Sequence, residues 1–178
     1  MTFDPQPTLR GSLLELRPLR EDDWTELFAV ASDPLIWEQH PQHDRYTEPV
    51  FREFFRLALE SGSAFVAVDL ADGRIIGSSR YHAYSEETRQ MEIGWTFLAR
   101  SHWGGRYNGE MKRLMIAHAF GHVDAIVFVI GARNLRSQQA VRNIGAVFAG
   151  PLAEGDTETV VYRLANPRAN PLANPRAG

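Results

Sequence analysis

The chain has 178 residues, 44% of them hydrophobic and 23% charged, a composition typical of one soluble globular domain with a full core. Its net charge of −3 provides no basic field for nucleic acid, and the lack of cysteine excludes disulfides, thiolate zinc sites and cysteine nucleophiles. The N-terminal sequence has no apolar signal core, and no apolar run approaches the roughly 20 residues that span a bilayer. We therefore expect a cytoplasmic protein with neither nucleic acid nor membrane as a partner.

The first third of the chain predicts one strand and then helices. Residues 1–11 read as a loose lead-in, and residues 12–19 alternate as a strand does. The acidic run that begins at Glu21 suits the start of a helix that ends before Pro34. A short helix over residues 35–39, a polar loop and a longer helix up to residue 60 follow, and Thr47 is the expected cap of that longer helix.

A period of two then replaces the helical period. Residues 64–70 and 74–84 read as strands joined by a turn at Asp72-Gly73, and residues 91–98 read as a third strand of an antiparallel meander. The alternation of this third strand predicts an apolar face and a polar face: Met91, Ile93, Trp95 and Phe97 against Glu92, Gly94 and Thr96.

A glycine-rich loop over residues 103–108 separates this strand from a predicted helix over residues 109–123. The first turn of such a helix directs unpaired N–H groups and its positive dipole end into the loop, which makes a ready phosphate site. Residues 125–130 are apolar without alternation, as expected of a buried strand parallel to residues 91–98. Asn134 is the predicted cap of a last helix, strands over 147–152 and 159–164 follow, and the Ala-Asn-Pro repeats of residues 165–178 predict disorder.

Three sequence segments, in this order, carry a resemblance to a known family. They are Leu16-Arg17-Pro18-Leu19 with the acidic helix start, Glu92-Ile93-Gly94-Trp95 with the glycine-rich loop and Glu110, and Asn134-Leu135-Arg136-Ser137 with the helix up to Gly145. Over residues 12–164 the chain resembles a GCN5-related N-acetyltransferase (GNAT), in the RimJ/RimL-like branch that acetylates the N-termini of ribosomal proteins.

The resemblance implies an α/β fold with a mixed, mostly antiparallel sheet of about seven strands, splayed at its centre and flanked by helices on both faces. Acetyl-CoA is the implied co-substrate, held in the gap of the splayed sheet. Its pantetheine arm is expected to pair with backbone near Phe97, Leu98 and Ala99, and its pyrophosphate to lie on the loop N–H groups. The implied cofactor-binding residues are Phe97, Leu98, Ala99, Trp103, Gly104, Gly105, Arg106, Tyr107, Asn108, Asn134 and Ser137.

The loop departs from the family pattern at two positions. Arg106 stands where a glycine is expected, and Asn108 where a glycine or alanine is. Gly105 is a candidate to supply the missing backbone freedom, and asparagine tolerates left-handed geometry better than most residues. A non-catalytic module that binds or senses CoA is therefore an alternative to an enzyme.

Glu92 and Ser137 are the candidate catalytic residues by resemblance. Acetylation requires a neutral amine, a donor for the developing oxyanion and an acid for the departing thiolate. Glu92 is the candidate general base, against the alternative of a structural pair with Arg80 or Arg89. Ser137 is the candidate acid, since no tyrosine equivalent is evident, against the alternative of a hydroxyl that satisfies backbone at the helix start.

The acceptor is expected to be an amine, either a protein or peptide N-terminus or a small molecule such as an amino acid, polyamine or antibiotic. Its candidate contacts are Trp37, His40, Arg45, Tyr81 and His82. His118 and His122 have a spacing that suits zinc, but no third ligand is evident, and we predict no metal. Relatives of this family are often dimers, which makes a homodimer the expectation.

Overall fold

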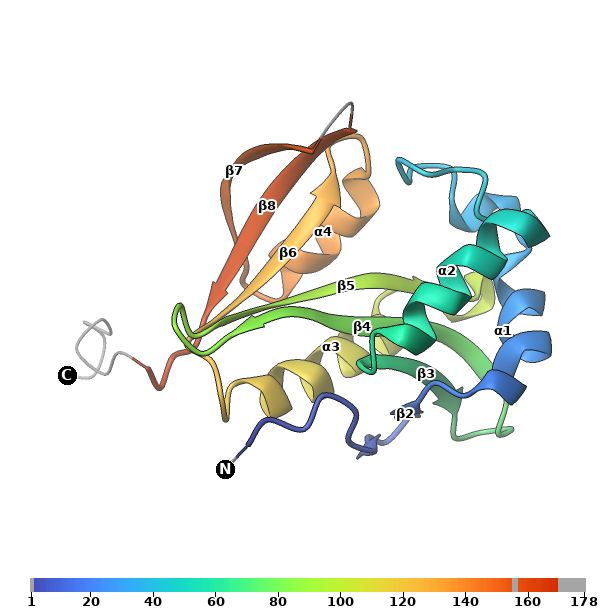
Figure 1. Ribbon diagram of the computed structural model, residues 1–178, viewed down its shortest axis with the longest axis horizontal. Coiled ribbons are helices and arrows are strands. Elements are labelled where there is room, and N and C mark those ends of the chain that lie inside the picture. Colours follow the sequence, from blue (N-terminus) through green and yellow to red (C-terminus); the bar gives the residue numbers. More distant parts are fainter. Residues whose placement is uncertain (1, 155–156, 170–178) are drawn as a thin grey trace.

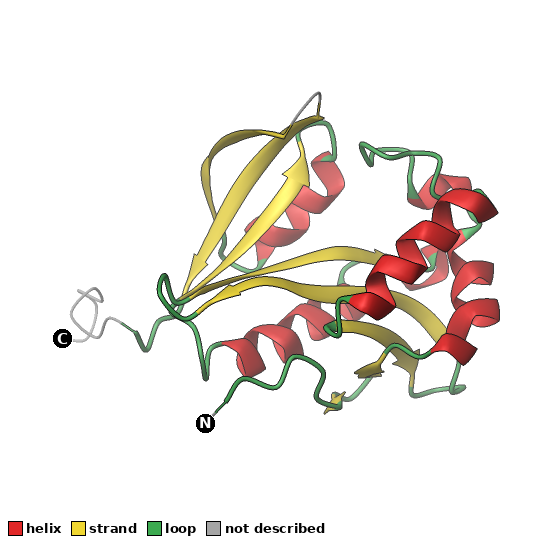
Figure 2. Ribbon diagram, in the orientation of Figure 1, coloured by secondary structure: helices red, strands yellow, loops and turns green. Residues whose placement is uncertain are grey.

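The computed structural model describes residues 2–154 and 157–169, which form an eight-stranded sheet with helices on both faces (Figures 1 and 2). The strands are β1 (Leu9–Arg10), β2 (Leu14–Pro18), β3 (Ala64–Asp69), β4 (Ile75–Ser85), β5 (Gln90–Leu98), β6 (Ala125–Gly131), β7 (Val147–Glu154) and β8 (Thr157–Ala165). The α-helices are α1 (Trp24–Ala31), α2 (Glu48–Glu60), α3 (Arg106–Ala119) and α4 (Leu135–Asn143), and short 3-10 helices span Glu21–Asp23, Pro34–Ile36 and Arg100–His102.

The strand order is β1-β2-β3-β4-β5-β6-β8-β7, and β5 and β6 are parallel whereas their neighbours pair antiparallel. The mixed fold, the β3–β4–β5 meander and the parallel crossover through α3 are therefore confirmed. The expected lead-in is corrected, because Leu9 pairs with Leu16 and forms the additional edge strand β1. This strand raises the count from about seven to eight.

Several predicted element ends were wrong. Helix α3 begins at Arg106 rather than 109 and ends at Ala119, because Gly105 already makes the turn that precedes the helix. The short helix expected over 35–39 is the 3-10 helix Pro34–Ile36. Thr47 does precede α2, but its hydroxyl donates to the Asp44 carbonyl 2.9 Å away and does not cap the helix.

The predicted disorder of the tail does not begin at residue 165. Ala165 is the last residue of β8, and Asn166 is buried with its amide nitrogen donating to the carbonyls of Phe120 and Val123. These two bonds satisfy carbonyls in the segment that follows α3, so the first residues of the tail belong to the fold. A turn is expected between the strands over 147–152 and 159–164, and its residues 155–156 lie outside the described residues, as do the remaining repeats at 170–178.

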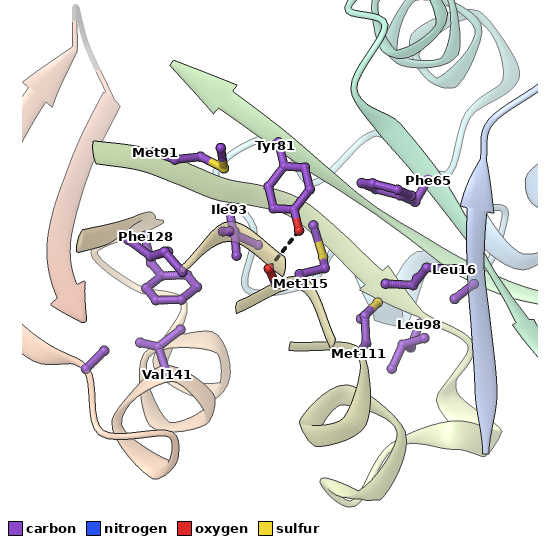
Figure 3. Close-up of a cluster of buried hydrophobic side chains, with 14 of the residues drawn as sticks. Leu16, Phe65, Tyr81, Met91, Ile93, Leu98, Met111, Met115, Phe128 and Val141 are labelled. Atoms are coloured by element: carbon purple, nitrogen blue, oxygen red, sulfur yellow. Dashed lines mark hydrogen bonds between the residues drawn. The ribbon is translucent and has the colours of Figure 1, made fainter. Parts of the chain in front are cut away.

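Two apolar clusters cover the opposite faces of the sheet. One packs α3 and α4 against the central strands, and Figure 3 shows its members Ile93, Met115 and Phe128. Tyr81 belongs to it, and its hydroxyl donates to the Met115 carbonyl at 2.7 Å (Figure 3). The second packs α1 and α2 against the other face and is rich in aromatic rings, including Phe51. Both helix layers are thereby fixed to the strands that carry the site.

A β-bulge interrupts the alternation predicted for β5. Ser78 pairs with Phe97 and Arg80 with Gly94, so β5 has one more residue than β4 between these pairs. Trp95 has a φ of 51°, a left-handed conformation that is rare for a bulky residue. The prediction that Trp95 and Phe97 share a face with Met91 is corrected, because both pack in the α1–α2 cluster.

Candidate active site

The parallel strands β5 and β6 pair only over a short stretch, where Gln90, Met91 and Glu92 face Ala125, Ile126 and Val127. Beyond this stretch the two strands diverge, as Figure 1 shows. A cavity of about 520 Å³ occupies the divergence, and its walls include the β5 segment from Ile93 to Leu98, the end of β6 and the first turns of α4. The β5 backbone after Glu92 is thus available to pair with an extended ligand.

The glycine-rich loop closes one end of this cavity. Gly104 and Gly105 have φ values of 101° and 98°, a conformation that residues with a Cβ rarely adopt. The indole nitrogen of Trp103 donates to the Leu98 carbonyl at 3.0 Å, which holds the loop against the end of β5. Helix α3 starts immediately after Gly105, so the unpaired N–H groups of its first turn lie next to the cavity.

The two unusual loop residues take roles that the sequence did not indicate. Gly104 and Gly105 make the turn, so Arg106 is the first residue of α3 and needs no left-handed conformation. Asn108 also lies within α3 and has no positive φ, so the expectation of a left-handed conformation at this residue was wrong. Its side of the helix lines the cavity together with Trp103, Gly104 and Gly105.

Tyr107 anchors the loop and is not part of the cavity lining. Its hydroxyl lies 3.2 Å from both carboxylate oxygens of Asp69, and His102 Nε2 lies 3.0 Å from one of them. A hydrogen bond from the Ala71 N–H, with further bonds from His102 and Tyr107, lowers the pKa of Asp69 despite its burial. Asp69 therefore ties the end of β3 to both ends of the loop, and the Tyr107 side chain serves the loop rather than the cavity.

Glu110 fastens the next turn of α3 to the start of the sheet. Its carboxylate accepts hydrogen bonds from the N–H groups of Ser12, Leu13 and Leu14 and from the Ser12 hydroxyl, at 2.7 to 3.0 Å. Burial by itself raises the pKa of Glu110, but these four bonds outweigh it and lower the pKa to about 2. The helix that carries the loop is thus locked to β2.

Glu92 lies half-buried where β5 and β6 separate, and two buried cations act on it. Its charge favours the charged forms of Arg80 on β4 and Lys112 on α3. A Cβ at Gly94 would lie 3.0 Å from Glu92 Oε1, so the room that glycine leaves accommodates the Glu92 carboxylate itself. The alternative partner Arg89 instead pairs with Asp124 at 2.9 Å.

Lys112 is a buried residue of the cavity that the sequence analysis missed. Its ammonium donates to the Thr96 hydroxyl and lies 5.6 Å from the centre of the Phe128 ring, so it touches both diverging strands. Burial lowers the pKa of Lys112 to about 7, against the opposing charge of Glu92. The available signal was its spacing of four from Asn108, which places both on the cavity side of α3.

The start of α4 forms the wall opposite β5. The predicted cap is confirmed, since the Asn134 side chain accepts a hydrogen bond from the Ser137 N–H at 3.1 Å. Ser137 lines the cavity, and among the described residues its hydroxyl makes no hydrogen bond. The guanidinium of Arg136 lies 3.9 Å from the Trp103 ring centre, so α4 and the loop meet across the cavity.

The five acceptor candidates divide between two adjoining cavities. Trp37 and His40 line the cavity between β5 and β6, His82 and Tyr81 line a second cavity of about 1000 Å³, and Arg45 lines both. Burial, and after it the charge of Arg45, lower the pKa of His40 to about 3, which keeps its ring neutral. The Tyr81 hydroxyl is committed to the core, and burial raises its pKa.

Comparisons with known proteins identify the family of this chain. The family described as "Acetyltransferase (GNAT) domain" matches residues 14–147. The chain belongs to the GNAT acetyltransferase family. No curated protein matches the sequence.

Solved structures of GNAT proteins share the fold. A probable acetyltransferase of the GNAT family from Chromobacterium violaceum is 21% identical with a TM-score of 0.82, over 95% of this chain and 91% of that one. A putative acetyltransferase from T. thermophilus is 25% identical with a TM-score of 0.76, over 96% and 94%. Spermidine N-acetyltransferase from Vibrio cholerae, solved with CoA and spermine, is 16% identical with a TM-score of 0.69, over 88% and 97%.

This GNAT protein is an acetyl-CoA-dependent N-acetyltransferase, and its cavity fits the co-substrate. The β5 backbone after Glu92, with which β6 does not pair, suits an extended arm, and the loop with two glycines before α3 suits phosphates. Acetyl-CoA supplies the activated acetyl group. Eight of the expected cofactor-binding residues line the cavity: Phe97, Leu98, Trp103, Gly104, Gly105, Asn108, Asn134 and Ser137. The other three, Ala99, Arg106 and Tyr107, are not part of its lining.

The expectations that the protein binds no metal and has no membrane partner remain predictions. No group of three or more metal-ligating side chains lies together within residues 2–154 and 157–169. His118 is instead next to the N-terminal segment, where its Nε2 lies 2.8 Å from the Asp4 carbonyl and its ring contacts Phe3. No helix in the described part of the chain is long and apolar enough to cross a membrane.

Proposed function

We propose that this enzyme transfers the acetyl group to the α-amino group of a protein or peptide N-terminus, as the RimJ/RimL-like branch does. The observation that carries the proposal is the second cavity of about 1000 Å³, which adjoins the cofactor cavity at Arg45 and Trp95. Its size accommodates several residues of a chain end, and its walls combine aromatic and apolar side chains with a few polar groups.

In this proposal Glu92 accepts the proton of the amine, directly or through a water. An α-amino group has an ordinary pKa near 8, about two units below that of lysine, so a half-buried carboxylate suffices as the base. Ser137 on α4 donates a proton to the leaving sulfur, and its hydroxyl has no other hydrogen bond within the described residues. A backbone N–H near Phe97 or Leu98, just after the bulge, is the donor for the developing negative charge on oxygen.

A small-molecule amine is the second candidate, and the name of the Vibrio cholerae relative supports it. Polyamines fit this chain poorly, because the second cavity is lined by two cations, the half-buried Arg45 and the buried Arg80. The alternative of a non-catalytic module was based on Arg106, which stands where the family loop has a glycine. Gly104 and Gly105 have the left-handed conformations of the turn, so the loop does not need a glycine at position 106.

We also propose that the enzyme is a homodimer that acts in the cytoplasm. The side chains of Val147 and Phe148 on the edge strand β7 are 69% and 54% exposed, which supports an apolar contact there. Sedimentation velocity on the wild type, compared with a Phe148→Ser variant, tests the dimer: a wild type that sediments as a monomer overturns it.

The test of the proposed activity is steady-state acetylation of peptides by the wild type and two variants. Glu92→Gln is expected to lower kcat by roughly 10² to 10⁴ while acetyl-CoA affinity, measured by calorimetry, stays unchanged. Glu87→Gln, in the exposed turn between β4 and β5, is the matched control and should keep full activity. Equal kcat values for wild type and Glu92→Gln would remove Glu92 from the mechanism, and acceptance of small amines alone would remove the N-terminus as the substrate.

A further inference from the structure

The second cavity contains two arginines that the proposed chemistry does not use, Arg80, which is buried, and Arg45, which is half-buried. Arg80 on β4 is 7% exposed, and its Nε makes no hydrogen bond to any described residue. Its guanidinium lies 4.6 Å from the Trp95 ring centre and 5.8 Å from that of Phe54. A buried guanidinium with an unpaired N–H is costly unless a ligand completes its hydrogen bonds.

Arg45 also lies against the ring of Phe54. Its guanidinium lies 4.9 Å from the Phe54 ring centre, and its Nε donates to Gln42 Oε1 at 3.0 Å. Burial, and after it the positive charge of Arg80, lower the pKa of Arg45 to about 10, so both side chains are cationic at neutral pH. Two like charges are therefore held next to each other in a largely apolar wall.

The nearby acids do not balance this charge. The negative charge of Glu92 favours the charged form of Arg80, but it also favours the charged form of Lys112. Glu53 lines the cavity, yet its carboxylate pairs with Arg56 on the outside of α2. Asp44 acts on Arg45 from an exposed position, where water screens its charge.

From these contacts we infer that the acceptor amine carries a carboxylate, and that Arg45 and Arg80 bind it. The planar fork of arginine matches a carboxylate, and a carboxylate would complete the hydrogen bonds of Arg80 while neutralising the adjacent charges. The rings of Trp95 and Phe54 would hold the apolar part of the acceptor beside the cofactor cavity. This inference rests on the proposed transfer to an α-amine and narrows its acceptor to the acidic members of that class.

Matched acceptors test the inference. Ala-Glu-Phe-amide and Ala-Gln-Phe-amide differ only in the side-chain carboxylate, and free phenylalanine differs from phenylalanine amide only in the main-chain carboxylate. The wild type is expected to favour the acidic member of at least one pair by roughly 10- to 100-fold in kcat/KM, the range of charge-assisted hydrogen bonds. The pair that shows the preference tells whether a peptide side chain or a free amino acid supplies the carboxylate.

Variants assign the preference to the arginines. Arg80→Gln and Arg45→Gln should each reduce the preference to a few-fold, whereas Arg52→Gln is the control, since Arg52 also lies over a tryptophan ring but pairs with Glu48 on the surface. Melting temperature and acetyl-CoA affinity identify any variant that has lost its fold. If Arg80→Gln does not fold, Arg45→Gln and the wild-type preference still decide the question.

The outcomes separate this inference from the proposed function. Equal kcat/KM within both pairs, or a preference for spermidine, overturns the inference while the acetyltransferase stands. If no amine is acetylated, the N-acetyl forms of the two peptides are titrated by tryptophan fluorescence. Tighter binding of the acidic peptide then supports the inference although the proposed activity has failed, and equal binding overturns the inference as well.

Discussion

Replacing Glu110 by glutamine is expected to destabilise the fold in a pH-dependent way. Its four hydrogen bonds fasten the second turn of α3 to Ser12, Leu13 and Leu14 at the start of β2. Glutamine preserves the shape of the side chain but has one amide nitrogen that cannot accept from these N–H groups. The Ser12, Leu13 and Leu14 donors then lack an ionised acceptor in a buried position.

The magnitude follows from the pKa of Glu110. A pKa lowered from 4.5 to about 2 corresponds to about 3 kcal/mol of unfolding free energy at neutral pH. Since the folded-state pKa is depressed, this stability is fully present above the unfolded-state pKa of 4.5 and is lost as the pH falls through about 2. Linkage predicts that about 2 kcal/mol of it is lost between pH 7 and pH 3.

Urea unfolding followed by circular dichroism at both pH values measures this effect. The stability difference between the wild type and Glu110→Gln should narrow by about 2 kcal/mol from pH 7 to pH 3. Glu60→Gln is the matched control, because Glu60 pairs with Arg56 on the exposed side of α2 and should change stability by less than about 1 kcal/mol. A difference between wild type and Glu110→Gln that stays constant with pH would refute the reasoning.

Two further predictions concern the cofactor cavity. Gly105→Ala should weaken acetyl-CoA binding, measured by calorimetry, because a Cβ makes the φ of 98° unfavourable and shifts the loop; unchanged affinity would contradict the role of this turn. The folded-state pKa of Lys112 is lowered to about 7, whereas the unfolded-state pKa is 10.5, so between these pH values the unfolded chain binds more protons than the folded one. The unfolding free energy of the wild type should therefore rise with pH over this range, and Lys112→Met should abolish that rise. The wild type should gain about 2 kcal/mol relative to Lys112→Met between pH 7 and pH 9, and parallel stability curves would disprove the buried cation.

The sequence by itself determined the order and type of most elements and the family resemblance. Apolar residues at helical or alternating spacing bury one face of each element, so local pattern and burial agree over α2, β3 and β6. Asn134 and the glycine pair were readable because capping and left-handed turns depend on residues next to each other in the chain.

Tertiary structure alone decided which residues meet in the site. The bulge at Trp95 moved Phe97 to the other face, because the register of β5 depends on its partner β4 and not on its own alternation. Glu92 meets Arg80 and Lys112, and Arg80 meets Arg45, only where strands and helices distant in sequence pack together. Charge and burial at such meeting points depend on the whole fold, so a local pattern does not reveal them.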